Sequence, residues 1–260
     1  MFETIRIETD PRGVAHLWLA REDKHNALSA QMIRDLTAAA AQLGTDPAVR
    51  VVVLAAQGKS FCAGGDLGWM QDQMRADAET RRAGARELAM MLNALNTLPK
   101  PLIARVQGNA FGGGVGMISV CDIAIAAETA RFGLTEVRLG LIPATIAPYV
   151  VARIGAAGAR RSFLSGRLFD AAEALQLGLV SRVVPDEGLD AAIEAEIVPI
   201  LSAAPGAVAS AKALIRRLVP PPSPETVTET VAALVKRWED PESEAGIRAF
   251  FAREKPPWAG

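Results

Sequence analysis

Two glycine-rich segments constrain what this chain can fold into more than any other feature. They are FCAGGD (61–66) and FGGGVG (111–116), and each follows a hydrophobic run and precedes a helix-like stretch. That order places free backbone N–H groups at a helix N-terminus, where the helix dipole favours negative charge. Glycine also lets a ligand approach the main chain closely. One such segment alone is more often a tight turn, so the inference of a binding site depends on the pair.

Short hydrophobic runs predict the strands. The solid apolar runs at 51–55, in PLIARVQG (101–108) and at 123–127 are typical of strands buried in a parallel sheet. Phe2–Ile7 and Val14–Leu19 alternate between apolar and polar residues on either side of the turn sequence DPRG, which predicts a hairpin.

Longer stretches with helical periodicity separate these strands. Helices are expected over Leu28–Leu43, with Ser29 as N-cap, from Gly68 to about Leu98, and from FGGGVG to about Val120. Strands that alternate with helices indicate a layered α/β fold with right-handed crossovers. From Asp186 to Phe251 only helical patterns occur, broken by APG and VPPPSP. We therefore expect an α/β core domain over 1–185 and a helical region over 186–260.

Composition excludes several classes of protein. The formal net charge is −1 in 260 residues, so the chain has no basic excess for binding nucleic acid or an anionic membrane surface. The two cysteines, Cys62 and Cys121, are too few for a disulfide framework. The opening sequence MFETIRIETD lacks the order of a signal peptide, and no apolar run has the length of a membrane span. A cytoplasmic protein is the expectation.

Specific motifs exclude the common nucleotide, metal and hydrolase sites. A phosphate-binding loop of the Walker type needs Gly-Lys-Ser/Thr, but Gly114 is followed by Val115 and Gly116. A dinucleotide fingerprint counted from Gly112 would need glycine at Met117. The sequence contains neither HExxH nor G-x-S-x-G, so we expect no metal and no serine nucleophile. Cys62 is interpreted as a small buried thiol rather than a nucleophile.

A resemblance to a known family covers essentially the whole chain. SFCAGGDL (60–67), GNAFGGGVG (108–116) and FGLTEVRLGLIP (132–143) closely resemble the enoyl-CoA hydratase/isomerase (crotonase) family. The likeness continues through SGRLFDAAEALQLGLVSRVVP (165–185) and the terminal FFAREKPPW (250–258). It implies a spiral of ββα units with a helical C-terminal part, and an acyl-CoA substrate with no separate cofactor. It also implies a homotrimer or homohexamer assembled through the helical C-terminal region.

The resemblance assigns three catalytic positions. Backbone N–H groups of Ala63 and Gly113 match the donors that hold the thioester oxygen while it carries negative charge, a type of contact that contributes about 3 kcal/mol per donor. Glu136 matches the acid/base carboxylate, although an ion pair with Arg138 is the alternative from the residues alone. The first of the two glutamates found in many hydratases of the family is absent, because its position is Gly116.

The same resemblance implies the substrate-binding positions. Lys24, His25 and Ala27 match the strip where coenzyme A enters, although an exposed loop is the alternative for the first two. The N-cap role is the favoured interpretation of Asp66. Leu67, Trp69 and Met70 would line the acyl or pantetheine channel, and Arg253 and Lys255 match a basic segment that helps to hold the nucleotide end in relatives. The full set of expected substrate-binding residues is Lys24, His25, Ala27, Ala63, Gly64, Asp66, Leu67, Gly112, Gly113, Gly116, Thr135 and Pro143.

Three functions follow from this pattern. The first is a hydratase that adds water to a 2-enoyl-CoA with Glu136 as both base and acid. EVRLGLIPATIAPYVVARIG (136–155) most resembles hydratases that act on branched acyl groups of the methylglutaconyl type. The second is a double-bond isomerase, because one carboxylate can move a proton between two carbons. The third is a coenzyme A-thioester-binding protein without catalytic activity. A dienoyl-CoA isomerase is disfavoured, because Ala144 stands where its extra aspartate is expected.

Overall fold

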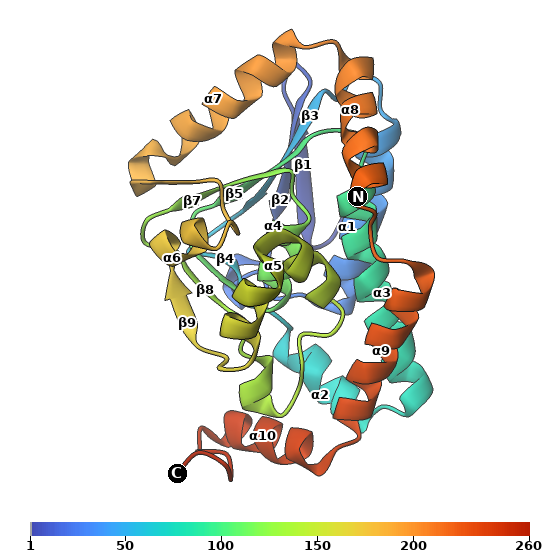
Figure 1. Cartoon of the computed structure of the whole chain (residues 1–260), viewed down its shortest axis with the longest axis vertical. Helices are drawn as coiled ribbons and strands as arrows, with labels where there is room; N and C mark the ends of the chain where they lie inside the picture. The colour runs from blue at the N-terminus through green and yellow to red at the C-terminus, as the bar shows by residue number, and fades with distance from the viewer. Residues whose placement is uncertain (1) are drawn as a thin grey trace.

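The computed structural model describes residues 2–260, which form two sheets surrounded by helices (Figure 1). The larger sheet has six strands in the order β1-β2-β3-β5-β7-β10. β1 pairs antiparallel with β2, and every other neighbouring pair is parallel. The strands of this sheet are β1 (Ile5–Thr9), β2 (Val14–Leu19), β3 (Val51–Ala56), β5 (Leu102–Val106), β7 (Ile123–Ala127) and β10 (Arg182–Val184). The expected hairpin and the three expected buried strands are confirmed.

A smaller sheet of four strands carries the glycine segments. Its order is β4-β6-β8-β9, with bounds β4 (Ser60–Cys62), β6 (Asn109–Phe111), β8 (Arg131–Gly133) and β9 (Leu168–Asp170). FCAGGD leaves the sheet at the end of β4, and FGGGVG leaves it at the end of the neighbouring strand β6. Because β4 and β6 are parallel, both glycine segments emerge at the same edge. The sequence alone did not predict this second sheet, because strands of three residues carry no readable periodicity.

Helices on both sides cover the larger sheet. One hydrophobic core lies between it and α1 (Ala30–Thr45), α3 (Ala78–Thr97), α4 (Gly113–Ser119) and α5 (Ala147–Phe163). The N-cap of α1 is confirmed, since the Ser29 hydroxyl accepts a hydrogen bond from the Met32 N–H. A second core forms where α7 (Leu189–Ser202) packs on the other face, with Ile193 and Ile197 against β3 and β5.

The helix expected from Gly68 to about Leu98 is two helices. They are α2 (Leu67–Arg75) and α3, and Asp77 separates them by capping the second helix, with its carboxylate accepting the N–H of Thr80 at 2.8 Å. The aspartate was readable as an N-cap signal but lies inside a continuous helical pattern.

After residue 185 the described chain is helical, as expected. The elements are η3 (Asp186–Gly188), α7, α8 (Pro205–Leu218), α9 (Pro224–Trp238) and α10 (Pro241–Ala252). The remaining elements are η1 (Glu22–Lys24), η2 (Glu136–Leu139) and α6 (Ala171–Gln176), and α5 is interrupted at Gly155, where φ is +70°. Among residues 2–260 no single helix has the length and apolar character to cross a membrane. Only α7 with its η3 turn and α8 pass that test when joined, and they are bent by 108°.

The C-terminal helices hold η2 in place. The carbonyl oxygen of Gly140 accepts hydrogen bonds from Nε and Nη2 of Arg237, at 2.9 and 2.6 Å, and from Oγ of Ser243 at 2.8 Å. A Cβ atom built on Gly246 of α10 would lie 2.7 Å from the carbonyl carbon and oxygen of Leu139. This close approach fixes the turn that carries Glu136.

Candidate active site

A cavity of about 500 Å³ joins both glycine segments to η2. Its wall includes backbone of Gly64, Gly65, Gly112 and Gly113 and the side chain of Glu136. The apolar part of the wall comes from α2, α3, α9 and the turn before α5, and contains Trp69, Met70, Leu88, Ile142, Leu234 and Trp238. A mostly apolar cavity strengthens the electrostatic contacts made against its wall, because less water screens the charges there than at the protein surface.

One oxygen of the Glu136 carboxyl group is buried without a hydrogen-bond partner in the described chain. This atom, Oε2, is inaccessible and makes no hydrogen bond to any residue of 2–260. A Cβ atom built on Gly112 would lie 2.9 Å from Oε1, so only glycine leaves room for the carboxyl at that point. Burial raises the pKa of Glu136 from 4.5 to about 7, with a smaller opposing effect from its own backbone N–H. A carboxyl group with this pKa exchanges protons readily near neutral pH.

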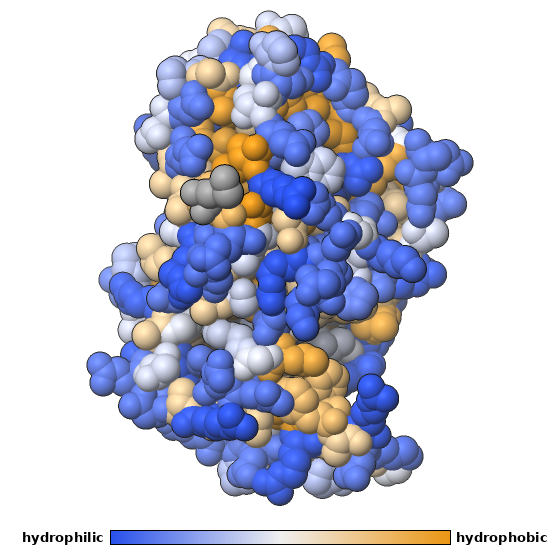
Figure 2. Space-filling model, turned by 180° about the vertical axis from the view of Figure 1, so that it is seen from behind, coloured by the Kyte–Doolittle hydropathy of each residue, from blue (hydrophilic) through white to orange (hydrophobic). Residues whose placement is uncertain are grey.

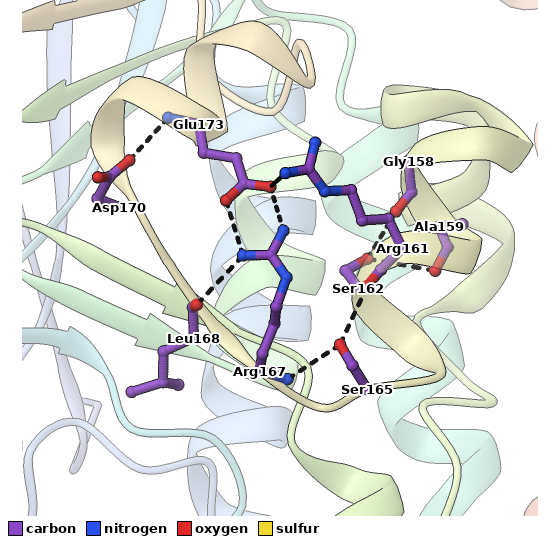
Figure 3. A network of polar contacts seen from close by, with 9 residues as sticks. All are labelled: Gly158, Ala159, Arg161, Ser162, Ser165, Arg167, Leu168, Asp170 and Glu173. Carbon is purple, nitrogen blue, oxygen red and sulfur yellow. Dashed lines mark hydrogen bonds and ion pairs between the residues drawn. The ribbon is translucent and has the colours of Figure 1, made fainter.

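The alternative interpretation of Glu136 as a structural ion pair is wrong. Within the described chain Arg138 makes no ion pair, with Glu136 or with any other carboxylate. Arg138 is exposed and lies in the cavity wall, and its side chain passes over Gly166. The nearby arginines differ in this respect, because Arg161 and Arg167 both pair with Glu173 (Figure 3). Arg138 is therefore a cation available to a ligand.

The structure places the first backbone donor differently from the sequence prediction. The N–H of Ala63 donates to the carbonyl oxygen of His25 at 3.0 Å, so it is already used within the protein. The chain then turns at Gly64, where φ is +94°. The residues on either side of Gly65 both bond to Leu28. The N–H of Leu28 donates to the carbonyl of Gly64 at 2.7 Å, and the carbonyl of Leu28 accepts the N–H of Asp66 at 3.0 Å. Successive peptide groups of an extended chain point to opposite sides, so the N–H of Gly65 points away from Leu28. It bonds to no described residue.

The second predicted donor, Gly113, has a backbone N–H that is free among the described residues. Gly113 is the first residue of α4, and its N–H has no acceptor among the described residues, as expected in a first helical turn. The neighbouring N–H of Gly112 is used, because it donates to the carbonyl of Gly133 at 2.9 Å. Gly65 and Gly113 thus present two unpartnered N–H groups in the wall of the cavity that contains Glu136.

A residue that the sequence analysis missed holds the first glycine segment. The side chain of Asn26 is fully buried and donates to the carbonyls of Gln57 and Ser60, at 2.8 and 2.9 Å. Its Oδ1 atom accepts the N–H of Arg21 at 2.9 Å. Asn26 and His25 both have positive φ, near 50°, and this turn aims the His25 carbonyl at Ala63. Asparagine tolerates the left-handed region, which was the available signal.

The remaining expected binding residues fall into two groups. Those in the cavity wall are Ala63, Gly64, Leu67, Gly112, Gly113, Thr135 and Pro143. Those outside it are Lys24, His25, Ala27, Asp66 and Gly116. Arg253 and Lys255 also lie outside the cavity wall.

Asp66 and Gly116, both outside the cavity wall, make contacts within the fold that account for their residue types. Asp66 caps α2 by accepting the N–H groups of Gly68 and Trp69, and it pairs with Arg21 at 2.9 Å. A substrate-binding role for Asp66 is not supported, since these contacts occupy its carboxylate. Gly116 faces Ile146: a Cβ atom built there would lie 2.6 Å from Cγ2 of Ile146. The place of a second glutamate is therefore filled by an isoleucine that itself lies in the cavity wall.

The buried thiol is as expected. Cys62 is fully buried beside the first glycine segment, and burial raises the pKa of its thiol to about 12. The thiolate needed for nucleophilic attack is thus disfavoured, which confirms the interpretation of Cys62 as a packing residue.

Comparison with known proteins agrees with this geometry. Residues 9–260 match the enoyl-CoA hydratase/isomerase family. A Mycobacterium bovis protein named "probable enoyl-CoA hydratase" is 34% identical over 98% of this chain and 97% of its own length. The crystal structure of an enoyl-CoA hydratase from Mycobacterium avium superposes with a TM-score of 0.87 at 31% identity, over all of both chains. An enoyl-CoA hydratase from Shewanella pealeana has a TM-score of 0.81 at 38% identity, over 99% of this chain and 96% of its own.

The fold and the cavity define a protein of the crotonase type, in which two glycine segments and an acidic turn surround one pocket. The chain belongs to the enoyl-CoA hydratase/isomerase family.

Proposed function

We propose that this protein is an enoyl-CoA hydratase that adds water across the double bond of a 2-enoyl-CoA thioester. The observation that carries the proposal is that one cavity contains Glu136, whose Oε2 is buried without a partner among the described residues, and the N–H groups of Gly65 and Gly113, which bond to no described residue. The names of the relatives and of the solved structures support hydration as the reaction.

In the proposed step the ionised Glu136 takes a proton from water while the water oxygen bonds to C3. The C2=C3 π electrons move toward the thioester, and the resulting negative charge lies on the thioester oxygen between the N–H groups of Gly65 and Gly113. Each preorganised donor of this kind contributes about 3 kcal/mol to the transition state. Glu136 then returns the proton to C2, which gives the 3-hydroxyacyl-CoA. Coenzyme A is part of the substrate, and the step needs no separate cofactor.

The pKa of Glu136 suits a group that both accepts and returns a proton. A carboxyl with an ordinary pKa would be too weak a base, and one with a much higher pKa would be protonated at neutral pH. At a pKa of about 7 both forms are populated near neutrality, which gives the best compromise for acid/base transfer.

A double-bond isomerase is the second candidate, and one observation favours it. Ile146 fills the space at Gly116, so no second carboxylate faces the substrate from that position. Glu136 alone would remove a proton from C2 of a 3-enoyl-CoA and deliver it to C4. The same two N–H groups would stabilise the intermediate enolate.

The acyl group is proposed to be branched and to carry a second carboxylate, as in 3-methylglutaconyl-CoA. The unpaired guanidinium of Arg138 in the cavity wall supports a carboxylate on the acyl chain, and the apolar wall supports the branch. Arg138→Gln should then raise KM for 3-methylglutaconyl-CoA and leave KM for crotonyl-CoA unchanged. Equal increases for both substrates would place Arg138 against coenzyme A instead.

A homotrimer or homohexamer is proposed as the assembly, built through the helical region 186–260. Figure 2 shows apolar atoms gathered in two areas of an otherwise hydrophilic face. The end of α8 exposes four large apolar side chains, which are 49 to 74% accessible: Leu214, Ile215, Leu218 and Val219. Arg253 and Lys255, beyond the cavity, are proposed to approach the nucleotide end of coenzyme A.

The deciding experiment incubates the purified protein with a panel of 2-enoyl-CoA and 3-enoyl-CoA substrates and identifies the products by mass. Hydration adds one water to the 2-enoyl substrates, whereas isomerisation leaves the mass unchanged and converts 3-enoyl to 2-enoyl thioesters. Tight binding without any product would contradict both reactions and indicate a protein that only binds the thioester.

A further inference from the structure

The hydroxyl group of Thr145, a buried residue of the cavity wall, has no role in the mechanism proposed above. Thr145 lies in the cavity wall and is only 5% exposed. Its Oγ1 atom makes no hydrogen bond to any residue from 2 to 260. In the described chain, the polar side-chain atoms that are both inaccessible and unpartnered belong to His16, Gln107, Glu136 and Tyr149. Oγ1 of Thr145 is not one of them, so it is accessible. The hydroxyl is therefore unpartnered but open to the cavity.

The segment that carries Thr145 approaches that of Glu136 at α4. Glu136 packs against Gly112, and Ile146, the next residue after Thr145, packs against Gly116. The N–H of Gly116 donates to the carbonyl of Gly112 at 3.1 Å, so these two glycines are one helical turn apart on the same face. Positions separated in this way are about 5–6 Å apart. The segments that carry Glu136 and Thr145 thus reach the same face of α4 at adjacent turns.

A single carboxylate leaves a water molecule poorly oriented. Glu136 accepts one O–H of the water, but the water can still rotate about that hydrogen bond. A second acceptor removes this freedom and directs a lone pair of the water oxygen at C3, a gain of the kind that orientation supplies in catalysis. In this protein the space of a second carboxylate is closed by Ile146, and the hydroxyl of the preceding residue is open to the cavity.

We propose that Thr145 holds the water that Glu136 activates, by accepting its second O–H. The proposal rests on the hydratase function proposed above. Thr145 itself neither gains nor loses a proton: the water oxygen bonds to C3, one water proton passes to Glu136 and then to C2, and the other stays on the new hydroxyl group. Thr145 is thus a residue for hydration alone, whereas Glu136 and the two N–H groups act in every reaction of the site.

The experiment compares Thr145→Val, which removes the hydroxyl and keeps the shape, with Thr145→Ser, which keeps the hydroxyl. Thr228→Val is the control, because Thr228 is exposed on α9 and lies outside the cavity wall. Thr145→Val should lower kcat for hydration of crotonyl-CoA by on the order of tenfold to a hundredfold with little change in KM, and Thr145→Ser should restore most of it. Thr228→Val should retain kcat.

A second reaction separates this role from a structural one. Exchange of the C2 protons of butyryl-CoA with deuterated water requires Glu136 and the two N–H groups but no addition of water to carbon. Thr145→Val should exchange at the wild-type rate, whereas Glu136→Gln should lose both reactions. Equal losses of hydration and exchange in Thr145→Val, or unchanged hydration, would overturn the proposal. If the wild-type protein exchanges C2 protons but hydrates no 2-enoyl-CoA, the proposed hydratase function fails instead.

Discussion

Replacing Glu136 with glutamine should abolish activity and stabilise the fold, and the gain in stability should depend on pH. In the folded protein the pKa of Glu136 is raised from 4.5 to about 7 by burial. Ionisation of Glu136 is therefore harder in the folded than in the unfolded chain. Each unit of pKa difference corresponds to about 1.4 kcal/mol, so ionising this carboxyl costs the fold about 3 kcal/mol above pH 7. Below pH 4.5 the carboxyl is neutral in both states and the cost disappears.

The sign of the effect is fixed by the direction of the pKa shift. The stability of the wild type relative to Glu136→Gln is highest below pH 4.5 and is lost as the pH rises to about 7. We expect the stabilisation by Glu136→Gln to be about 2–3 kcal/mol larger near pH 8.5 than near pH 5. All other groups titrate in both proteins and cancel in the difference.

Guanidinium unfolding followed by tryptophan fluorescence measures this difference, since the chain has four tryptophans. Protein concentration must be the same throughout, because assembly changes apparent stability. Glu229→Gln is the control, since Glu229 is exposed and makes no ion pair with a described residue. An equal gain for Glu136→Gln at both pH values, or no gain at either, would refute the placement of a desolvated carboxyl at this position.

Three further predictions follow from the same geometry. The kcat/KM for hydration should fall about tenfold per pH unit below pH 7 and level off above it, because Glu136 must be ionised to accept the proton of water. A profile that is flat down to about pH 5 would contradict this. Gly65→Pro should lower kcat by on the order of a hundredfold or more, because it deletes the proposed N–H donor. Gly65→Ala keeps the donor, and its Cβ atom would lie 3.6 Å or more from its neighbours, an ordinary contact distance. Similar kinetics for the two variants would exclude Gly65 as a donor. Gly246→Ala should lower activity although Gly246 lies outside the cavity wall. The new Cβ would lie 2.7 Å from the backbone of Leu139 and so shift η2, which carries Glu136. An unchanged kcat would show that α10 does not position Glu136.

Much of the fold was predictable because its long elements carry clear periodicity. The strands at 51–55 and 123–127, the hairpin and the N-cap at Ser29 all follow from local pattern, and each lies where the sequence placed it. The break between α2 and α3 was missed, because one capping aspartate competes with a helical pattern that continues on both sides. The short strands β4, β6, β8 and β9 form through pairing with one another, which no local pattern encodes.

The site was predictable in its residues but not in its hydrogen bonds. The resemblance identified Glu136 and both glycine segments, and the structure brings them into one cavity. It could not show that the Ala63 N–H is taken by His25, because that contact depends on the buried side chain of Asn26. Nor could it show that Ile146 fills the space at Gly116, since the two residues are thirty positions apart in sequence.

The most direct test of the central proposal is hydration of a 2-enoyl-CoA in ¹⁸O-labelled water by the wild type and by Glu136→Gln, with the product identified by mass. The account predicts that the wild type incorporates one labelled water at C3 and that the variant incorporates none while it still binds the thioester. Unchanged incorporation by Glu136→Gln, or no incorporation by the wild type with any substrate of the panel, would contradict it.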